Sequence, residues 1–214
     1  MHIAEGVLAP TVLFGGAVLT AVGTALGLRR LDTDHLLITG VLASFFFIAS
    51  LIHIPVGFTS AHLIGNGLVG ILLGWAAFPA ILVALFLQSL FFQFGGLTVL
   101  GVNTCTMALG ALIAYYAFHG ILRILPNTQG RKIASFAGGL LGVASSAFFT
   151  ACALAGTDEG FLNAAMALFL AHIPIMLAEA VICMFTITFI WRVRPTLLHL
   201  ELQTRTDNKK QSDK

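Results

Sequence analysis

The chain alternates between long apolar runs and short polar links. The apolar runs lie near residues 8–27, 36–53, 63–76, 77–94, 103–125, 133–155 and 162–191. Each run is compatible with a helix, because lipid requires every backbone polar group to be bonded within its own segment. The run 63–76 is short and rich in glycine for a span of about 20 residues, so it predicts a partial or tilted helix. We expect an all-α, polytopic membrane helical bundle of seven helices, with six as the alternative.

Two further segments lack the character of a spanning helix. Residues 94–103 are too rich in glycine for such a helix and predict a loop. Residues 201–214 have almost no apolar side chains and predict a disordered polar tail. We therefore divide the chain into one transmembrane domain, residues 1–200, and a cytoplasmic tail, residues 201–214.

Composition sets the class of protein. Hydrophobic residues make up 58% of the 214 residues and charged residues 9%, against about 25% charged in ordinary globular domains. So few charges cannot cover a soluble surface, which indicates a multi-pass membrane protein. The net charge is only +2, and the basic residues form no stripe along the sequence that would bind nucleic acid. Cys105, Cys152 and Cys183 show no C-x-x-C spacing and predict neither a disulfide framework nor a zinc site.

The basic residues predict the orientation in the membrane. The 11 Lys and Arg residues are Arg29, Arg30, Arg123, Arg131, Lys132, Arg192, Arg194, Arg205, Lys209, Lys210 and Lys214. With seven helices they fall after the first helix, between the fifth and sixth, and after the last. These places lie on one side, which the positive-inside rule assigns to the cytoplasm. We expect the N-terminus outside and the C-terminus inside, whereas six helices would break this consistency.

The opening dipeptide, Met1-His2, offers a chelate for a transition metal. The α-amine and the amide nitrogen between the two residues close a five-membered ring on the metal. The same amide nitrogen and the imidazole Nδ1 of His2 close a six-membered ring. Three nitrogens in a plane leave one position for another imidazole, which suits Ni(II) or Cu(II). The segment lacks the basic region of a signal peptide, so we expect Met1 to be retained.

Other polar residues gather on the predicted outer side. His62 is the leading candidate for the fourth ligand, because it lies at the predicted start of the third helix beside small residues such as Ser60. Asn103 predicts a helix N-cap or, alternatively, a support for the N-terminal segment. His172 and Glu179 are spaced so that both can face the bundle interior. For this pair a supporting role near the metal and a structural hydrogen bond are both open.

The sequence resembles the CbiM/NikM family, the substrate-capturing membrane component of energy-coupling-factor (ECF) importers for cobalt and nickel. The residues that carry the resemblance are Met1-His2-Ile3-Ala4-Glu5-Gly6, Ile54-Pro55-Val56-Gly57 through Ser60-Ala61-His62-Leu63-Ile64-Gly65, Gly95-Gly96-Leu97-Thr98 through Leu100-Gly101-Val102-Asn103, Met107, His172-Ile173-Pro174 and Glu179. They cover nearly the whole chain. Ala4 stands where the family often has Met, and Asn66 where it often has Gly. These departures remove no ligand, and the choice between cobalt and nickel stays open.

The resemblance implies a function and a set of ligands. Met1, His2 and His62 would hold Ni(II) or Co(II) as the transported substrate, without enzyme activity or a catalytic cofactor. The chain would lie in the cytoplasmic membrane of a bacterium or archaeon. Its partners would be a transmembrane coupling subunit and a pair of cytoplasmic ATPases, with a small auxiliary membrane subunit in some systems. The sequence has no Gly-x-x-x-x-Gly-Lys-Ser/Thr phosphate loop, so ATP hydrolysis falls to a partner.

Two alternatives come from other classes. A stand-alone permease for nickel, cobalt or copper, or an accessory membrane protein without ATPases, is left open by the residues, since Cu(II) binds nitrogen sites tightly. An intramembrane hydrolase built on His172 and Glu179 is disfavoured, because neither H-E-x-x-H nor G-x-S-x-G is present.

Because the α-amine and the imidazole must lose protons to bind a metal, we expect metal affinity to fall as the pH decreases.

Overall fold

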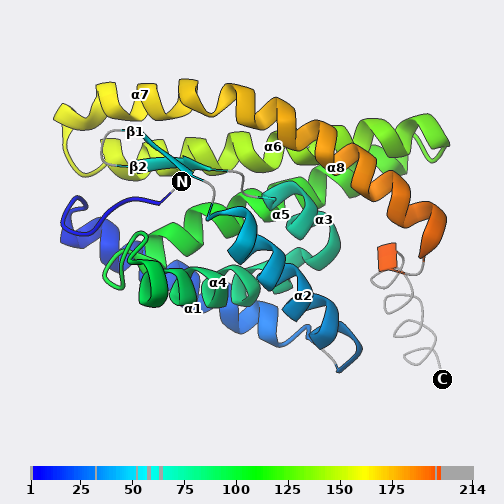
Figure 1. Cartoon of the computed structure of the whole chain (residues 1–214), viewed down its shortest axis with the longest axis horizontal. Helices are drawn as coiled ribbons and strands as arrows, with labels where there is room; N and C mark the ends of the chain where they lie inside the picture. Colours follow the sequence, from blue (N-terminus) through cyan, green and yellow to red (C-terminus); the bar gives the residue numbers. More distant parts are fainter. Residues whose placement is uncertain are drawn as a thin grey trace.

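The structure is a bundle of helices with one short β-hairpin in it (Figure 1). The computed structural model describes residues 2–31, 33–51, 53–56, 59–62, 65–195 and 197–198, with the backbone alone at residues 33–35, 53–56, 59–62 and 159. Its elements are α1 (Pro10–Leu28), α2 (Thr33–Ala49), β1 (His53–Val56), β2 (Thr59–His62), α3 (Asn66–Leu73), η1 (Gly74–Ala76), α4 (Ala77–Phe92), α5 (Leu100–Ile124), α6 (Thr128–Ala155), η2 (Glu159–Phe161), α7 (Leu162–Ala171) and α8 (Ile173–Val193). The predicted helical class is confirmed, and the hairpin is a small addition to it.

Several helices are long and apolar enough to cross a membrane. By length and composition alone, the described ranges contain five such segments: Pro10–Leu28, Asn66–Phe92, Leu100–Ile124, Thr128–Ala155 and Leu162–Val193. The second joins α3, η1 and α4, and the last joins α7 and α8. A shorter apolar helix covers Leu36–Ala49. The chain is therefore a membrane protein with several apolar helices, while the number of crossings and the side of each terminus stay predictions.

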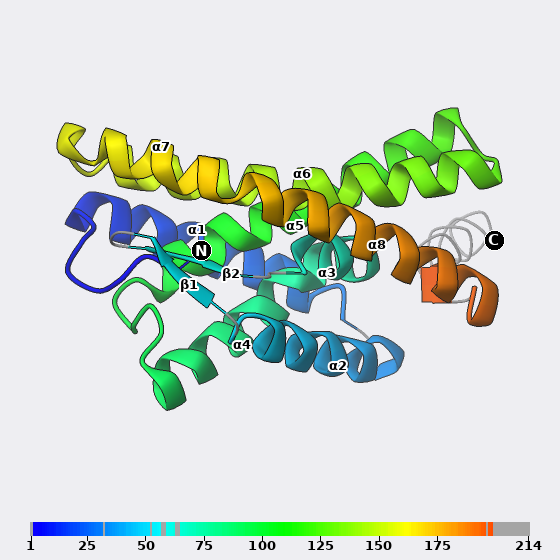
Figure 2. The same ribbon diagram turned by 45° about the horizontal axis from the view of Figure 1, so that its top comes forward.

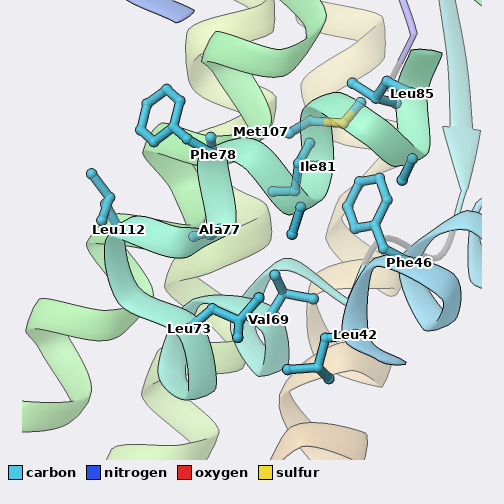
Figure 3. Packing of buried hydrophobic residues seen from close by; sticks show 14 of the residues in the cluster. Leu42, Phe46, Val69, Leu73, Ala77, Phe78, Ile81, Leu85, Met107 and Leu112 are labelled. Carbon is cyan, nitrogen blue, oxygen red and sulfur yellow. The ribbon is translucent and has the colours of Figure 1, made fainter. Parts of the chain in front are cut away.

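The described part of the glycine-rich run 63–76, residues 65–76, contains a partial helix followed by a reversal of the chain. Helix α3 has 8 residues, and it runs in the same direction as α5, since Gly70 lies against Ala111 and the Trp75 Nε1–H donates to the Tyr116 hydroxyl at 3.0 Å. At Gly74 the backbone φ is 53°, in the left-handed region that favours glycine. Helix α4 then leads back past α3, as Figure 3 shows.

The hairpin changes the setting of His62. Strands β1 and β2 pair antiparallel with His53 opposite His62. Pro55 of β1 has no N–H group and cannot continue a helix from α2. His62 therefore ends a strand, and α3 begins only at Asn66, so the prediction that His62 starts a helix is wrong. Helix α7 packs against both strands.

The centre of the bundle is built around α5, which packs against α1, α3, α4 and α6. Buried side chains of α2, α3, α4 and α5 meet there (Figure 3). Glycine allows the backbones to approach closely: a Cβ on Gly67 would lie 2.4 Å from the Gly139 Cα, and one on Gly70 would lie 2.0 Å from the Ala111 carbonyl oxygen. Small residues play this role where helices pack in lipid, and here they set the spacing of α3, α5 and α6.

The bundle has two chemically different ends. Directly after α1, the Arg30 guanidinium lies 5.5 Å from the centre of the Trp75 ring, and Arg131 lies in the first turn of α6. At the other ends of the same helices, the backbone N–H of Ala9 donates to Thr157 Oγ1 at 3.3 Å. Arg30 and Arg131, two of the cations that the sequence assigns to the cytoplasm, thus lie at the end of the bundle opposite to the N-terminal residues.

Candidate metal centre

Residues 2–9, the N-terminal segment, lead into α1 and lie beside the β1–β2 hairpin in both views (Figures 1 and 2). His2 belongs to this segment, and His62 is the last residue of β2. The fold therefore brings the backbones of the two predicted ligand-bearing segments to the same end of the bundle. Met1 and the side chains of Ser60 and His62, which were predicted as ligands or supports, lie outside the described residues.

His2 is buried and bonded to an amide within α4. Its side chain is 6% exposed, and its Nε2 lies 2.9 Å from the Oε1 of Gln88. Sequence reasoning missed Gln88, which is fully buried. The signal that could have found it is an amide side chain inside an otherwise apolar helix, because polar groups within spanning segments are costly and tend to be functional.

Asn103 binds the backbone of the N-terminal segment on both of its sides. The Ile3 N–H donates to Asn103 Oδ1 at 3.0 Å, and Asn103 Nδ2 donates to the Ile3 carbonyl at 3.1 Å. The N-cap prediction for Asn103 is wrong, because α5 begins at Leu100 and its N-cap residue is Val99. The alternative, a support for the N-terminal segment, agrees with these two bonds.

The glycine-rich loop before α5 holds the same segment from another side. The carboxylate Oε1 of Glu5 accepts bonds from the Thr98 backbone N–H at 3.0 Å and from the Thr98 hydroxyl at 3.3 Å. Gly96 has a φ of +130°, and a Cβ there would lie 2.0 Å from Glu5 Cγ, so the approach requires glycine. The loop predicted over residues 94–103 is present over residues 93–99 and packs on the N-terminal segment, whereas residues 100–103 belong to α5.

Glu179 and His172 are both buried, at 4% and 0% exposed, and they have different partners. Glu179 Oε1 accepts the Gly65 N–H at 2.7 Å, directly before α3 and close in sequence to His62. His172 joins α7 to α8, where Pro174 interrupts the helical bonding. Its Nδ1 donates to the Leu168 carbonyl at 2.7 Å, and its Nε2 has no hydrogen-bond partner in the part of the chain that the structure describes.

The described side chains do not make a conventional metal cluster. Among the described residues, no three His, Cys, Asp or Glu side chains come together to hold a metal ion. A site built on Met1, His2 and His62 would instead take two of its nitrogens from the backbone, so a search for clustered side chains would not find it. What the described residues supply is a network of hydrogen bonds that holds His2 and Ile3 in fixed positions.

Comparison with known proteins identifies the relatives of this arrangement. Residues 2–197 match the profile of the CbiM family, described as the cobalt uptake substrate-specific transmembrane region. The chain belongs to the CbiM family. A protein of Haemophilus influenzae, provisionally named a metal transport protein, is 41% identical to the chain over 97% of its residues and 99% of the relative's length.

Further relatives carry more specific names. The cobalt transport protein CbiM of Sorangium cellulosum is 33% identical over 92% of this CbiM-family chain and 94% of its own length. The fused nickel transport protein NikMN of Rhodobacter capsulatus is 35% identical over 74% of the chain and 46% of its own length. A crystal structure of a truncated transition metal transporter is similar with a TM-score of 0.74 and 28% identity, covering 90% of this chain and 99% of that one.

These matches set the class of function. This CbiM-family chain is a membrane component of cobalt or nickel uptake and not an enzyme. The sequence resemblance to this family is confirmed, and the helical fold agrees with that of a solved transition metal transporter.

Proposed function

We propose that this chain captures Ni(II) or Co(II) from outside the cell for an ATP-driven ECF-type importer. The ligands are the Met1 amine, the amide nitrogen and imidazole Nδ1 of His2, and the His62 imidazole. The observation that carries the proposal is the burial and anchoring of His2 next to the hairpin that ends at His62. A histidine at the second position of a mobile terminus would be solvated, whereas this one is enclosed.

The anchoring suits a chelate that includes the backbone. Asn103 bonds both polar groups of Ile3, so the residue that follows the chelate is held on both sides. A chelating segment that is ordered before the metal arrives loses less entropy on binding, which raises its affinity. Burial also strengthens the attraction between the cation and its ligands, because the surroundings screen charge less than water does.

The remaining predicted residues have supporting roles in this proposal. Glu179 holds the chain at Gly65 and thereby fixes the end of the hairpin that carries His62, and its buried carboxylate offsets part of the positive charge of the metal. His172 lies at the end of α7, the helix that packs on the hairpin. Ser60 precedes His62 in β2 and supports the position of that strand.

The two ends of the bundle fit this direction of transport. The N-terminal segment lies outside and the end with Arg30 and Arg131 faces the cytoplasm, where a coupling subunit and a pair of ATPases bind and drive release. A stand-alone permease differs in one measurable respect: it moves metal without ATPases. Uptake of radioactive Ni(II) and Co(II) into vesicles, with and without the coupling subunit and ATPases, separates the two modes.

The metal site is tested by titrating purified protein that retains its native N-terminus. We expect tight Ni(II) binding that is lost in His2→Ala, in His62→Ala and in protein extended by one residue before Met1, since each change removes a nitrogen ligand. His119→Ala is the matched control, because His119 bonds to Tyr115 of its own helix at 2.9 Å and lies in the second half of α5. Full Ni(II) affinity in the extended protein would refute the proposed site.

A further inference from the structure

A chain of hydrogen bonds reaches His2 from the last turn of α2. The Ser50 hydroxyl donates to the Phe46 carbonyl at 2.6 Å, with a longer contact to the Phe47 carbonyl at 3.3 Å. A hydroxyl carries one hydrogen, so Ser50 Oγ can only accept a bond from any further partner. The Phe47 carbonyl is likewise an acceptor. Two acceptors at the end of α2 therefore face the side chain of Gln88.

These acceptors fix the direction of the Gln88 amide. Gln88 Nε2 lies 3.0 Å from the Phe47 carbonyl oxygen and also bonds to Ser50 Oγ. Reversing the amide would place Oε1 against two oxygen acceptors, so the NH₂ group must be on this side. Gln88 and Ser50 are both 0% exposed, and water cannot replace either bond. The Oε1 atom consequently points to His2.

The direction of the amide determines where the His2 ring carries its proton. Gln88 Oε1 can only accept a bond, and it lies 2.9 Å from His2 Nε2, so Nε2 must be the donor. A neutral imidazole has one N–H group, and its other nitrogen holds a lone pair. We propose that Gln88 is a positioning residue that holds His2 in the tautomer with the proton on Nε2 and the lone pair on Nδ1, ready for the metal.

This inference rests on the proposed function, in which Nδ1 is the chelating atom of the ring. Nδ1 is near enough to the backbone to share a six-membered ring with the amide nitrogen, whereas Nε2 lies on the far side of the imidazole. The opposite tautomer would have to move its proton and lose the Gln88 bond before it could bind. Partners of this kind orient imidazole ligands in metal sites, and losing them typically lowers metal affinity 10- to 100-fold.

The tautomer can be measured without any metal. Full-length protein labelled with ¹⁵N-histidine is placed in lipid nanodiscs, and His2→Ala identifies the signals of His2 in long-range ¹H–¹⁵N spectra. We expect a protonated Nε2 in the unaltered protein and in Gln88→Glu, whose protonated carboxyl group donates its O–H on the side of the Phe47 carbonyl and accepts the His2 bond with its other oxygen. In Gln88→Leu we expect a mixture of tautomers and a Ni(II) affinity about 10- to 100-fold lower. Ser89→Ala is the matched control, because its hydroxyl bonds within α4, to the Phe86 carbonyl.

Each outcome separates this inference from the proposed function. If the unaltered protein carries the proton on Nδ1, or if Gln88→Leu keeps the tautomer of the unaltered protein, the assignment to Gln88 is overturned even when Ni(II) binds. If Gln88→Leu alters the tautomer but the unaltered protein does not bind Ni(II), the assignment stands and the proposed function fails. Size-exclusion profiles of both Gln88 variants show whether a loss of affinity comes from unfolding, and the Glu variant tests the proton acceptor in a folded chain.

Discussion

The N-terminal segment and the α3–α5–α6 centre of the bundle are held in place by different kinds of contact. Polar side chains from four places along the chain bond to the segment: Gln88 of α4, Thr98 of the loop before α5, Asn103 of α5 and Thr157 after α6. In the centre, Gly67 and Gly70 bring backbones together so closely that a Cβ would collide with them. The first region adds several directional bonds to the burial of Ile3 and Leu8 in an apolar cluster. The second depends mainly on the absence of side chains, with one buried bond from Asn66 of α3 to Ser146 of α6.

The difference separates two tasks within one chain. Glycine contacts fix the distance between helices but leave no particular atom exposed to a ligand. Hydrogen bonds depend on angle as well as distance, so they can hold one nitrogen of His2 in a chosen direction. We therefore expect substitutions in the centre to remove the folded protein, and substitutions around the segment to lower metal affinity while the bundle stays intact.

The largest effect is expected for Gly70→Val. A side chain there would meet the Ala111 carbonyl oxygen, from which even a Cβ would lie only 2.0 Å away. Because the obstacle is backbone, α3 and α5 would have to separate, at a cost of about 3 kcal/mol or more. The measurement is the thermal unfolding of protein in detergent, followed by size-exclusion chromatography. Gly120→Ala in α5 is the control, since no atom of the described residues outside its own stretch of helix lies within 4 Å of its Cβ position, and it should unfold at an equal or higher temperature.

An intermediate effect is expected for Asn103→Leu. The change removes the bonds that Asn103 makes to the Ile3 N–H and the Ile3 carbonyl. Losing them costs about 2 kcal/mol of the free energy that holds the segment in place. This corresponds to about a 30-fold loss of Ni(II) affinity, measured by calorimetric titration, with an unchanged elution profile. The comparison variant is Asn127→Ala, whose side chain caps α6 by accepting the Gly130 N–H at 2.7 Å. That variant should lower thermal stability and leave Ni(II) affinity as it was; the reverse pattern would contradict the division between the two regions.

The helical bundle could be predicted because its signal is local. Apolar runs of spanning length identify helices without knowledge of their neighbours, and the glycines of the run 63–76 correctly indicated a partial helix. Helix ends were less certain. Asn103 has the chemistry of an N-cap, yet α5 starts three residues before it. The side-chain amide of Asn103 instead bonds to Ile3, which is 100 positions away in the sequence.

The site could be predicted only in part for the same reason. The chelating ability of Met1-His2 is a property of adjacent atoms, and the sequence displays it directly. Gln88 was hidden inside an apolar run, where its average surroundings predict membrane helix and say nothing of its partner. His62 was assigned to a helix because an apolar run follows it, although Pro55 and the pairing of β1 with β2 place it in a hairpin. Such contacts depend on how distant segments meet.

The smallest effect is expected where the N-terminal segment meets solvent. Glu5 and Thr98 are bonded at an exposed position, where water competes with both partners and the net gain from such a bond is small. We expect Glu5→Ala to lower Ni(II) affinity about twofold, and Glu5→Gln, which retains an acceptor, to lower it less.

A double-mutant cycle of Glu5→Ala with Thr98→Val sharpens this last expectation. Thr98→Val removes the hydroxyl bond at 3.3 Å but keeps the backbone bond at 3.0 Å, so the coupling between the two substitutions should be smaller than the effect of Glu5→Ala alone. If Glu5→Ala reduced affinity as strongly as Asn103→Leu, the exposed rim would hold the segment as firmly as its buried bonds. Burial would then not be what makes the inner bonds decisive for the position of His2.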